Sequence, residues 1–184
     1  MTETIGYQVV RVLGKVEIRN YPPMVMATVK GGDDDRGFSI LFDYISGNNE
    51  AREKVPMTAP VVSRRPGARI EMTAPVITDE RTFSFVLPQG SDMKTVPRPL
   101  DSRIELISIP SRHVAALRFS GRAYYREVVE KEDELLTVLR GQAIRTKGAP
   151  FLMRYNMPLT PGFMRRNEVG VEVDVEDSIG GAER

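Results

Sequence analysis

Apolar and polar residues alternate or cluster along this chain in short runs that predict strands. Residues 25–29 and 113–119 have the length and the residue types of buried strands. Residues 82–87 alternate between the two classes, and residues 169–175 do so again near the end of the chain. The pattern therefore predicts several short strands distributed over the whole sequence.

Two segments have the spacing of an amphipathic helix. In the first, Phe38, Leu41, Phe42 and Ile45 fall at i, i+3, i+4 and i+7, which predicts one apolar face. Three acidic residues, 33–35, precede it where carboxylates satisfy free N–H groups, and a glycine at position 47 follows where a helix ends. The second helix is expected over residues 122–140. Its expected buried side chains are Tyr125, Val128, Val129, Leu136 and Leu139.

The order of these elements occurs twice. Shifting the chain by 88 positions aligns residues 16–22 with residues 104–110, and Val25 with His113. We therefore predict one α+β domain over residues 1–176, built from a duplicated β/α unit with pseudo-two-fold symmetry at 16–87 and 104–175. A flexible polar tail is expected at 177–184. The repeat alone does not decide between a cleft between two sheets and a distorted antiparallel β-barrel.

Composition narrows the chemistry. The 184 residues include no cysteine and one histidine, and 26 basic residues against 25 acidic ones give a net charge of +1. These numbers argue against disulfides, thiol catalysis and multi-histidine metal sites, and they give no electrostatic case for nucleic acid or a membrane surface. No apolar run approaches the roughly 20 residues of a membrane span, and no signal peptide is evident, so we expect a cytoplasmic protein without membrane insertion. Catalytic motifs such as a nucleophile elbow or a P-loop are missing, so we expect no enzyme.

Three short strings carry most of the functional information. Residues 57–61 read Met-Thr-Ala-Pro-Val, residues 72–76 repeat them, and residues 165–168 read Arg-Arg-Asn-Glu. In these strings and in the run 155–169 the chain resembles the SOUL/heme-binding protein family, over about residues 7–174. The resemblance implies a distorted β-barrel flanked by two helices. It also implies non-covalent binding of heme or another tetrapyrrole, for buffering, transport or sensing. The duplicated unit further resembles ligand-binding domains related to the gyrase-inhibitor family.

The resemblance places a hydrophobic groove beside the first helix and the loop before Arg-Arg-Asn-Glu. The matching residues are Phe38, Leu41 and Phe42 on the helix, and Leu159, Pro161 and Phe163 in the loop. A porphyrin is a flat apolar plate with two carboxylates on one edge, so it needs apolar walls and cations at the mouth. The candidate cations are Arg154, Arg165 and Arg166. Where the family has basic residues in this region, this chain has Asp43 and Thr160.

The same residues also fit structural roles. Phe38 and Phe42 suit a helix fixed to its sheet, and Arg165 and Arg166 suit pairing with Glu168 or with backbone carbonyls. The alternative function is a regulatory or interaction module that binds another amphipathic small molecule or a protein partner. A hydrolase built on the same cleft is a third hypothesis.

Single residues leave further alternatives open. His113 shares a predicted strand face with apolar residues, which fits either a heme-iron ligand or a hydrogen-bonded core histidine, and the resemblance does not place a ligand there. Met57 and Met72 fit a groove wall, a weak axial ligand or a core filler. Pro60 and Pro75 each remove a ladder donor, which predicts sheet edges or bulges at both strings.

Overall fold

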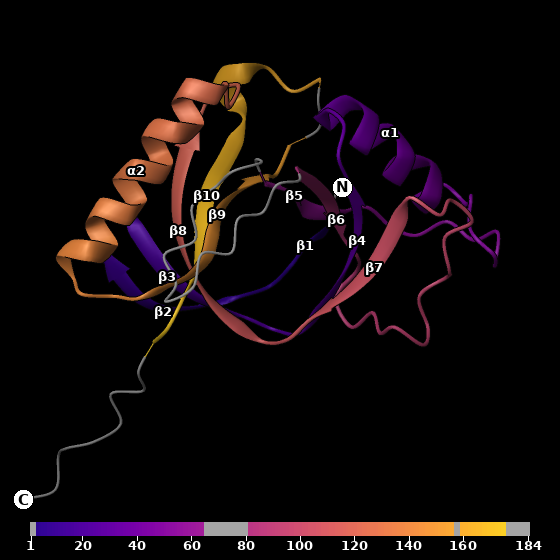
Figure 1. Ribbon diagram of the computed structural model, residues 1–184, viewed down its shortest axis with the longest axis horizontal. Coiled ribbons are helices and arrows are strands. Elements are labelled where there is room, and N and C mark those ends of the chain that lie inside the picture. Colours follow the sequence, from indigo (N-terminus) through magenta and orange to yellow (C-terminus); the bar gives the residue numbers. More distant parts are fainter. Residues whose placement is uncertain (1–2, 65–80, 157–158, 176–184) are drawn as a thin grey trace, which may run out of the picture.

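The computed structural model describes residues 3–64, 81–156 and 159–175. Its strands form one curved sheet, and two helices lie over that sheet (Figure 1). The helices are α1 (Asp34–Ile45) and α2 (Tyr125–Gly141), and a short 3-10 turn forms η1 (Gly162–Met164). The strands are β1 (Glu3–Thr4), β2 (Gln8–Leu13), β3 (Val16–Tyr21), β4 (Met24–Lys30), β5 (Thr58–Arg64), β6 (Thr82–Val86), β7 (Ile104–Ile109), β8 (Arg112–Ser120), β9 (Thr146–Arg154) and β10 (Arg166–Val173). The second Met-Thr-Ala-Pro-Val string, with Met72 and Pro75, and the tail at 177–184 lie outside the described residues.

The strand order has an internal symmetry. The antiparallel path runs β2-β3-β8-β10-β9-β5-β6-β4-β7, and β1 adds a short parallel pairing to β5. The strands of the two halves correspond as β3 to β7, β4 to β8, β5 to β9 and β6 to β10. If each strand on the path from β3 to β7 is replaced by its counterpart and the path is then read in reverse, the same order results. The register agrees: Val16 of β3 pairs with Leu117 of β8, and 88 positions away Ile104 of β7 pairs with Val29 of β4. This order is the one that two copies of one unit predict, and superposition of the halves stays a prediction.

The sheet is open, so the predicted closed barrel is not confirmed. Within the described residues, β2 and β7 end the path and each pairs with one neighbour. The sheet bends strongly enough to bring its two halves toward each other, as the curved ribbons in Figure 1 show. A curved open sheet with two helices on one face is the coarser α+β architecture that the sequence indicated.

Hydrophobic clusters show which face carries the helices. Leu135 and Leu139 of α2 pack with Leu152 of β9, and α1 packs with Val61 of β5. Val61 and Ser63 are two residues apart on β5, so their side chains point to the same face of the sheet, and Ser63 pairs with Leu152 of β9. Both helices therefore cover the same face. A third cluster, which includes Phe151, covers the opposite face. Phe151 points away from the helices, and the residues on either side of it in β9 therefore point toward them.

The buried face of α1 agrees with the predicted one only in part, at Leu41 and Ile45. Gly37, Ile40, Leu41, Tyr44 and Ile45 are buried, whereas Phe42 is 44% exposed. A Cβ at Gly37 would lie 2.9 Å from the Cβ of Phe83, so the missing side chain allows the helix to approach β6 closely. This contact sets the rotation of the helix about its axis and leaves Phe38 and Phe42 at the border of the packed face. The acidic start is confirmed, because the Asp33 carboxylate accepts a hydrogen bond from the Arg36 backbone N–H at 2.8 Å.

The second helix begins three residues later than predicted, and of its predicted buried residues Val128 and Leu139 are buried, whereas Val129 and Leu136 are only half-buried. Val128, Glu132, Leu135 and Leu139 are its buried residues. They fall at i, i+4, i+7 and i+11, which is a regular helical stripe. The prediction that Tyr125 is buried is wrong, because the helix starts at this residue and its first turn lies at the edge of a cavity. No described helix has both the length and the apolar content needed to cross a bilayer.

The first Met-Thr-Ala-Pro-Val string begins just before β5, a central strand. Pairing between β5 and β6 shifts register between Thr58 and Val61, and Pro60 lies in that interval. Pro60 was predicted to lie at a sheet edge or at a bulge, and the structure places it at a bulge. The bulge matters for the site because it precedes Val61, whose side chain lines the main cavity.

Candidate functional site

A cavity of about 340 Å³ opens between α1 and the segments that precede α2 and β10, and we call it the main cavity. Its floor is the helix-bearing face of β5, β6, β9 and β10. One part of its wall is apolar and consists of Phe38, Met57, Val61 and Phe83. The other part is polar and consists of Asp34, Asp35, Arg122, Arg154, Asn156, Arg165 and Asn167. Three arginines against two aspartates leave this lining with an excess of positive charge.

The apolar wall is held by aromatic packing. The Phe38 ring is stacked on Phe42 with centroids 5.7 Å apart, and it meets Phe85 edge-on at 5.4 Å. Phe83 is buried and packs against Gly37 of α1. Phe38 is thus fixed from two sides and presents its remaining surface to the main cavity.

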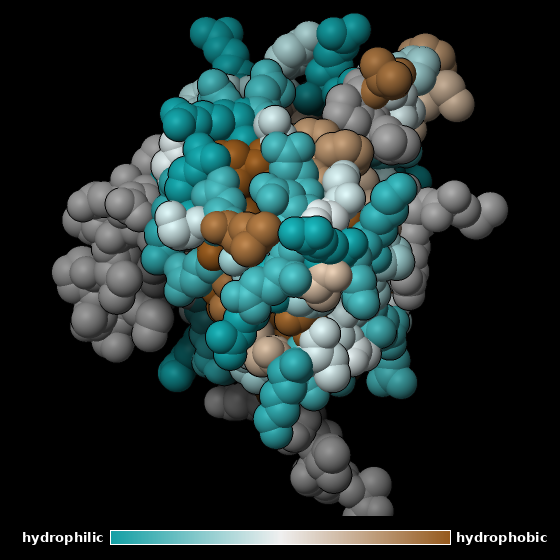
Figure 2. Space-filling model, turned by 90° about the vertical axis from the view of Figure 1, so that its right-hand side faces the viewer, coloured by the Kyte–Doolittle hydropathy of each residue, from teal (hydrophilic) through white to brown (hydrophobic). Residues whose placement is uncertain are grey.

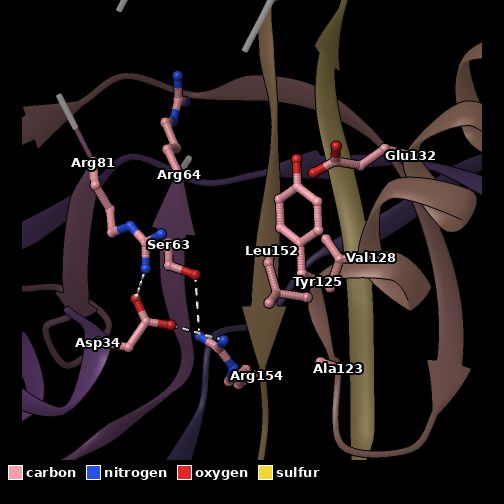
Figure 3. Close-up of a pocket in the computed structure, with 10 residues that line it drawn as sticks. All are labelled: Asp34, Ser63, Arg64, Arg81, Ala123, Tyr125, Val128, Glu132, Leu152 and Arg154. Atoms are coloured by element: carbon pink, nitrogen blue, oxygen red, sulfur yellow. Dashed lines mark hydrogen bonds and ion pairs between the residues drawn. The ribbon is translucent and has the colours of Figure 1, made fainter. Parts of the chain in front are cut away.

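A smaller cavity of about 150 Å³, the side cavity, adjoins the main one. Both are lined by Asp34 and Arg154, whose Oδ2 and Nη2 atoms are 2.8 Å apart. Arg81 approaches the same carboxylate at 3.7 Å, and Arg154 also donates to Ser63 Oγ at 3.0 Å. Figure 3 shows Asp34 between the two guanidinium groups, with Tyr125 and Glu132 across the cavity. The Asp34–Arg154 pair is therefore the partition between the two cavities.

The loop at 159–165 forms one side of the mouth of the main cavity. Arg165 donates from Nε to the Thr160 carbonyl at 2.7 Å. Asn167 donates to the Gly121 carbonyl at 2.9 Å, which ties β10 to the segment before α2. A Cβ at Gly162 would lie 2.8 Å from Cγ of Arg122, so the turn packs directly on that side chain. These contacts place Arg122 and Arg165 together at the mouth.

The structure brings some of the predicted site residues together and separates others. Phe38, Arg154 and Arg165 line the main cavity, whereas Leu41 is fully buried beneath α1. Phe42 lies outside the lining and reaches it only through its stack on Phe38. Leu159 and Phe163 are 96% and 82% exposed, so their side chains point away from the cavity. Asp43 lies outside the lining, and Thr160 contributes a backbone carbonyl to Arg165.

Arg166 lies on the other face of the sheet, in a cluster around the fully buried Glu168. Glu168 accepts two hydrogen bonds from Arg19, at 2.5 and 3.0 Å, one from Tyr155 at 2.8 Å and one from Arg166 Nη2 at 2.7 Å. Arg166 also lies over the Tyr155 ring at 4.1 Å. Burial opposes ionisation of Glu168, but the hydrogen bonds and charge of Arg19, with further hydrogen bonds from Arg166 and Tyr155, hold its pKa below the usual value. Pairing with Glu168, one of the two structural roles that the sequence allowed for this arginine, is therefore observed.

His113 is half-buried on β8, opposite Asn20 of β3, and is not among the residues that line either cavity. Across the described ranges, no three His, Cys, Asp or Glu side chains converge as a metal site would require. The side chains that usually coordinate heme iron are His, Cys, Met and Tyr. Among the residues that line the main cavity, Met57 is of this kind.

Arg122, Asn156 and Asn167 line the main cavity but were not predicted. Asn167 belongs to the Arg-Arg-Asn-Glu string, so strand alternation from Glu168 would have placed it on the opposite face from Glu168 and thus in the cavity. Arg122 carried no sequence signal, because it was assigned to a helix that in fact starts at Tyr125.

Comparison with known proteins identifies relatives of this chain. The family model described as SOUL heme-binding protein matches residues 2–172. Heme-binding protein 2 of Homo sapiens is 31% identical over 169 residues, which cover 85% of this chain and 77% of that protein. Heme-binding protein 2 of Mus musculus is 30% identical over 145 residues, covering 75% of this chain and 65% of that protein.

Solved structures share the fold at low identity. The EcmrR C-terminal domain superposes with a TM-score of 0.60 at 10% identity, covering 91% of this chain and 98% of that one. A hydrolase from Listeria innocua gives 0.56 at 12% identity, covering 90% and 94%. Both likenesses concern the fold alone. With the family model spanning nearly the whole chain and a human relative above 30% identity, the chain belongs to the SOUL heme-binding protein family.

Proposed function

We propose that this protein binds heme or a related tetrapyrrole non-covalently in the main cavity, as a binding protein rather than an enzyme. The observation that carries the proposal is the division of one cavity into an apolar wall and an arginine-rich edge. Phe38, Met57, Val61 and Phe83 offer the flat apolar contact that a macrocycle needs. Arg122, Arg154 and Arg165 offer cations for the carboxylates on its edge.

The size of the cavity supports partial enclosure. About 340 Å³ lies at the lower end of the range for ligand pockets, so a tetrapyrrole would keep part of its edge outside. The side cavity supplies further room if the Asp34–Arg154 pair parts to let Arg154 reach a ligand carboxylate. Arg81 then remains near Asp34 as its counter-ion.

The residues present fit heme in their chemistry. Bound heme would supply an iron centre, and Met57 is the lining residue able to offer it a thioether sulfur. The role of the chain's own residues is to enclose one face of the plate, exclude water from it and neutralise its carboxylates. Buffering, transport and sensing of the ligand all follow from reversible binding of this kind.

Titration with ferric heme tests the proposal. We expect wild-type protein to saturate at one heme per chain with a shifted Soret band. Replacing Phe38 by alanine removes part of the wall and should weaken affinity about tenfold, which is about 1.4 kcal/mol. The replacement Leu100→Ala is a matched control, because Leu100 is an exposed apolar residue outside the cavity lining.

Two results separate the hypotheses. Equal affinity of the Phe38→Ala variant and wild type would contradict the assigned cavity. Absence of saturable heme binding by a folded wild-type protein would favour the alternative, a module that binds another amphipathic molecule or a protein partner. Far-UV circular dichroism and the thermal midpoint of each variant establish that the fold is intact.

We also infer that the halves at 16–87 and 104–175 descend from one duplicated unit. The support is the symmetric strand order and the shared register of β3–β8 and β7–β4. Superposition of an experimental structure of one half on the other would test this inference directly.

A further inference from the structure

The turn beside the cavity mouth exposes an unusual amount of apolar surface. Leu159, Phe163 and Met164 are 96%, 82% and 63% exposed, and they fall within six consecutive residues. Large apolar side chains that gather on one exposed turn mark an interaction site more often than chance. Other exposed large apolar residues lie on the edge strand β2, where Val9, Val10 and Val12 are 49–62% exposed, and at the start of α2. On the side that carries α1 and β7, Figure 2 shows apolar and polar surface intermixed.

The turn is braced so that these side chains stay outside. Met164 N–H donates to the Pro161 carbonyl at 2.9 Å, and Arg165 N–H donates to the Gly162 carbonyl at 3.1 Å. Arg165 Nε closes the loop onto the Thr160 carbonyl at 2.7 Å. A braced turn pays little ordering entropy on docking, so its apolar side chains are available without refolding.

Cations lie directly beside this apolar turn. Gly162 packs against the stem of Arg122, and Arg165 follows Met164 in the chain. Both arginines also line the main cavity, so apolar tip, cations and cavity mouth form one continuous surface. The net charge of +1 predicted no membrane contact, but that balance averages over the whole chain and does not describe this local group.

We propose that the turn at 159–164, with Arg122 and Arg165, docks on the surface of an anionic lipid bilayer. Leu159, Phe163 and Met164 enter the interfacial region, and the arginines remain at the level of the anionic headgroups. Exposed apolar side chains next to basic ones are the combination that interfacial anchors use, and three such side chains give reversible binding. This inference adds to the proposed function and rests on it, because docking would serve ligand binding by the main cavity. Tetrapyrroles partition into bilayers, and docking would bring the cavity mouth to the layer that holds them.

The absence of tryptophan from the chain allows a direct test. A Phe163→Trp variant carries a single indole at the tip of the turn. We expect its emission to shift to the blue on addition of phosphatidylcholine vesicles that contain phosphatidylserine, and to shift less with phosphatidylcholine alone. A Val12→Trp variant is the matched control, because Val12 is 62% exposed on the edge strand β2 and should show no shift.

Co-sedimentation with the same vesicles gives the affinity. The double variant Leu159→Ser/Phe163→Ser should bind vesicles at least roughly tenfold more weakly than wild type. The Arg122→Gln variant should lose most of the preference for phosphatidylserine. Unchanged vesicle binding by the double variant would overturn the proposal. So would a turn-dependent dimer in analytical ultracentrifugation without vesicle binding, which would make a second copy the occupant.

Heme titration in the absence of vesicles separates this inference from the proposed function. The double variant should bind heme from solution as wild type does, because its altered side chains point away from the cavity. If wild type binds vesicles through the turn but never binds heme, docking stands and the proposed ligand fails. If heme binds and vesicles do not, the ligand stands and docking fails.

Discussion

Two clusters of arginine and carboxylate lie on opposite faces of one sheet, and they differ in how far water reaches them. In the Glu168 cluster the carboxylate is fully buried and the Arg19 side chain is 3% exposed. In the Asp34–Arg154 pair both side chains are 30% exposed and border two cavities. Similar ions thus form a sealed contact between strands on one face and a partly exposed partition between two cavities on the other. The difference indicates that the extent of burial, rather than residue type, distinguishes the two ion pairs.

The largest expected effect is a loss of stability when the buried Glu168 cluster is broken. Replacing Glu168 by glutamine leaves Arg19 and Arg166 without the anion that they share; among the described residues, the carboxylate that still pairs with Arg19 is that of Glu17, at 2.8 Å. Removing one partner from a buried pair typically costs about 3–5 kcal/mol. Urea denaturation should show a loss of that size in the free energy of unfolding. Glu50→Gln, at an exposed position, should change it little.

If the Glu168→Gln variant instead kept its stability but lost heme affinity, the two faces would not be independent. That outcome would contradict the comparison between a structural cluster and a binding one.

The second effect is the pH dependence of the same cluster. The folded pKa of Glu168 lies below its ordinary value of 4.5, because the hydrogen bonds and charge of Arg19 and the hydrogen bonds of Arg166 and Tyr155 outweigh burial. A depressed folded pKa contributes stability that is complete above the unfolded pKa and is lost as pH falls through the folded value. The stability difference between wild type and Glu168→Gln should therefore be constant near neutral pH and shrink in acid.

Denaturation curves collected from about pH 7 down to about pH 3 measure that difference. A difference that widened as the pH fell would mean that the carboxyl group contributes most when it is protonated. That result would argue against an ionised Glu168 in the folded protein.

The smallest expected effect on stability is at the partition. Arg154→Gln breaks a half-exposed pair and should cost less than about 1 kcal/mol of unfolding free energy. Because Arg154 lines the cavity edge assigned to the ligand carboxylates, the same change should weaken heme binding roughly tenfold. Arg126→Gln is the matched control, since Arg126 is an exposed arginine of α2 outside both cavity linings. A large stability loss with unchanged heme affinity would assign this pair to the fold.

Sequence patterns predicted the elements better than their faces. The positions of α1 and of the strands β4, β6, β8 and β10 agree with prediction to within a few residues. The face of α1 does not, because Gly37 decides it through contact with Phe83, and a glycine carries no hydrophobic signal. An amphipathic pattern counts apolar side chains and cannot register a close approach that depends on the lack of one.

The different positions of the two adjacent arginines depend on where β10 begins. Arg165 and Arg166 were assigned together to the cavity, but β10 begins at Arg166 and alternation sends its side chain toward Glu168. The predicted strand began three residues later, so its alternation could not be applied to this pair. The carboxylate of Glu168 and the carbonyl of Thr160 are their observed acceptors, as the structural alternatives anticipated.

The crossed pairing of the two halves has a consequence for the nascent chain. One edge of β3 pairs with β2 in the same half, but its other edge pairs with β8, so Val16 can form this second pairing only after Leu117 has left the ribosome. At ordinary rates of synthesis the N-terminal half spends several seconds with this strand edge unsatisfied. Long-range closures of this kind also slow spontaneous folding. The first half is therefore open to pairing with other chains through this edge for as long as its second half is still being made.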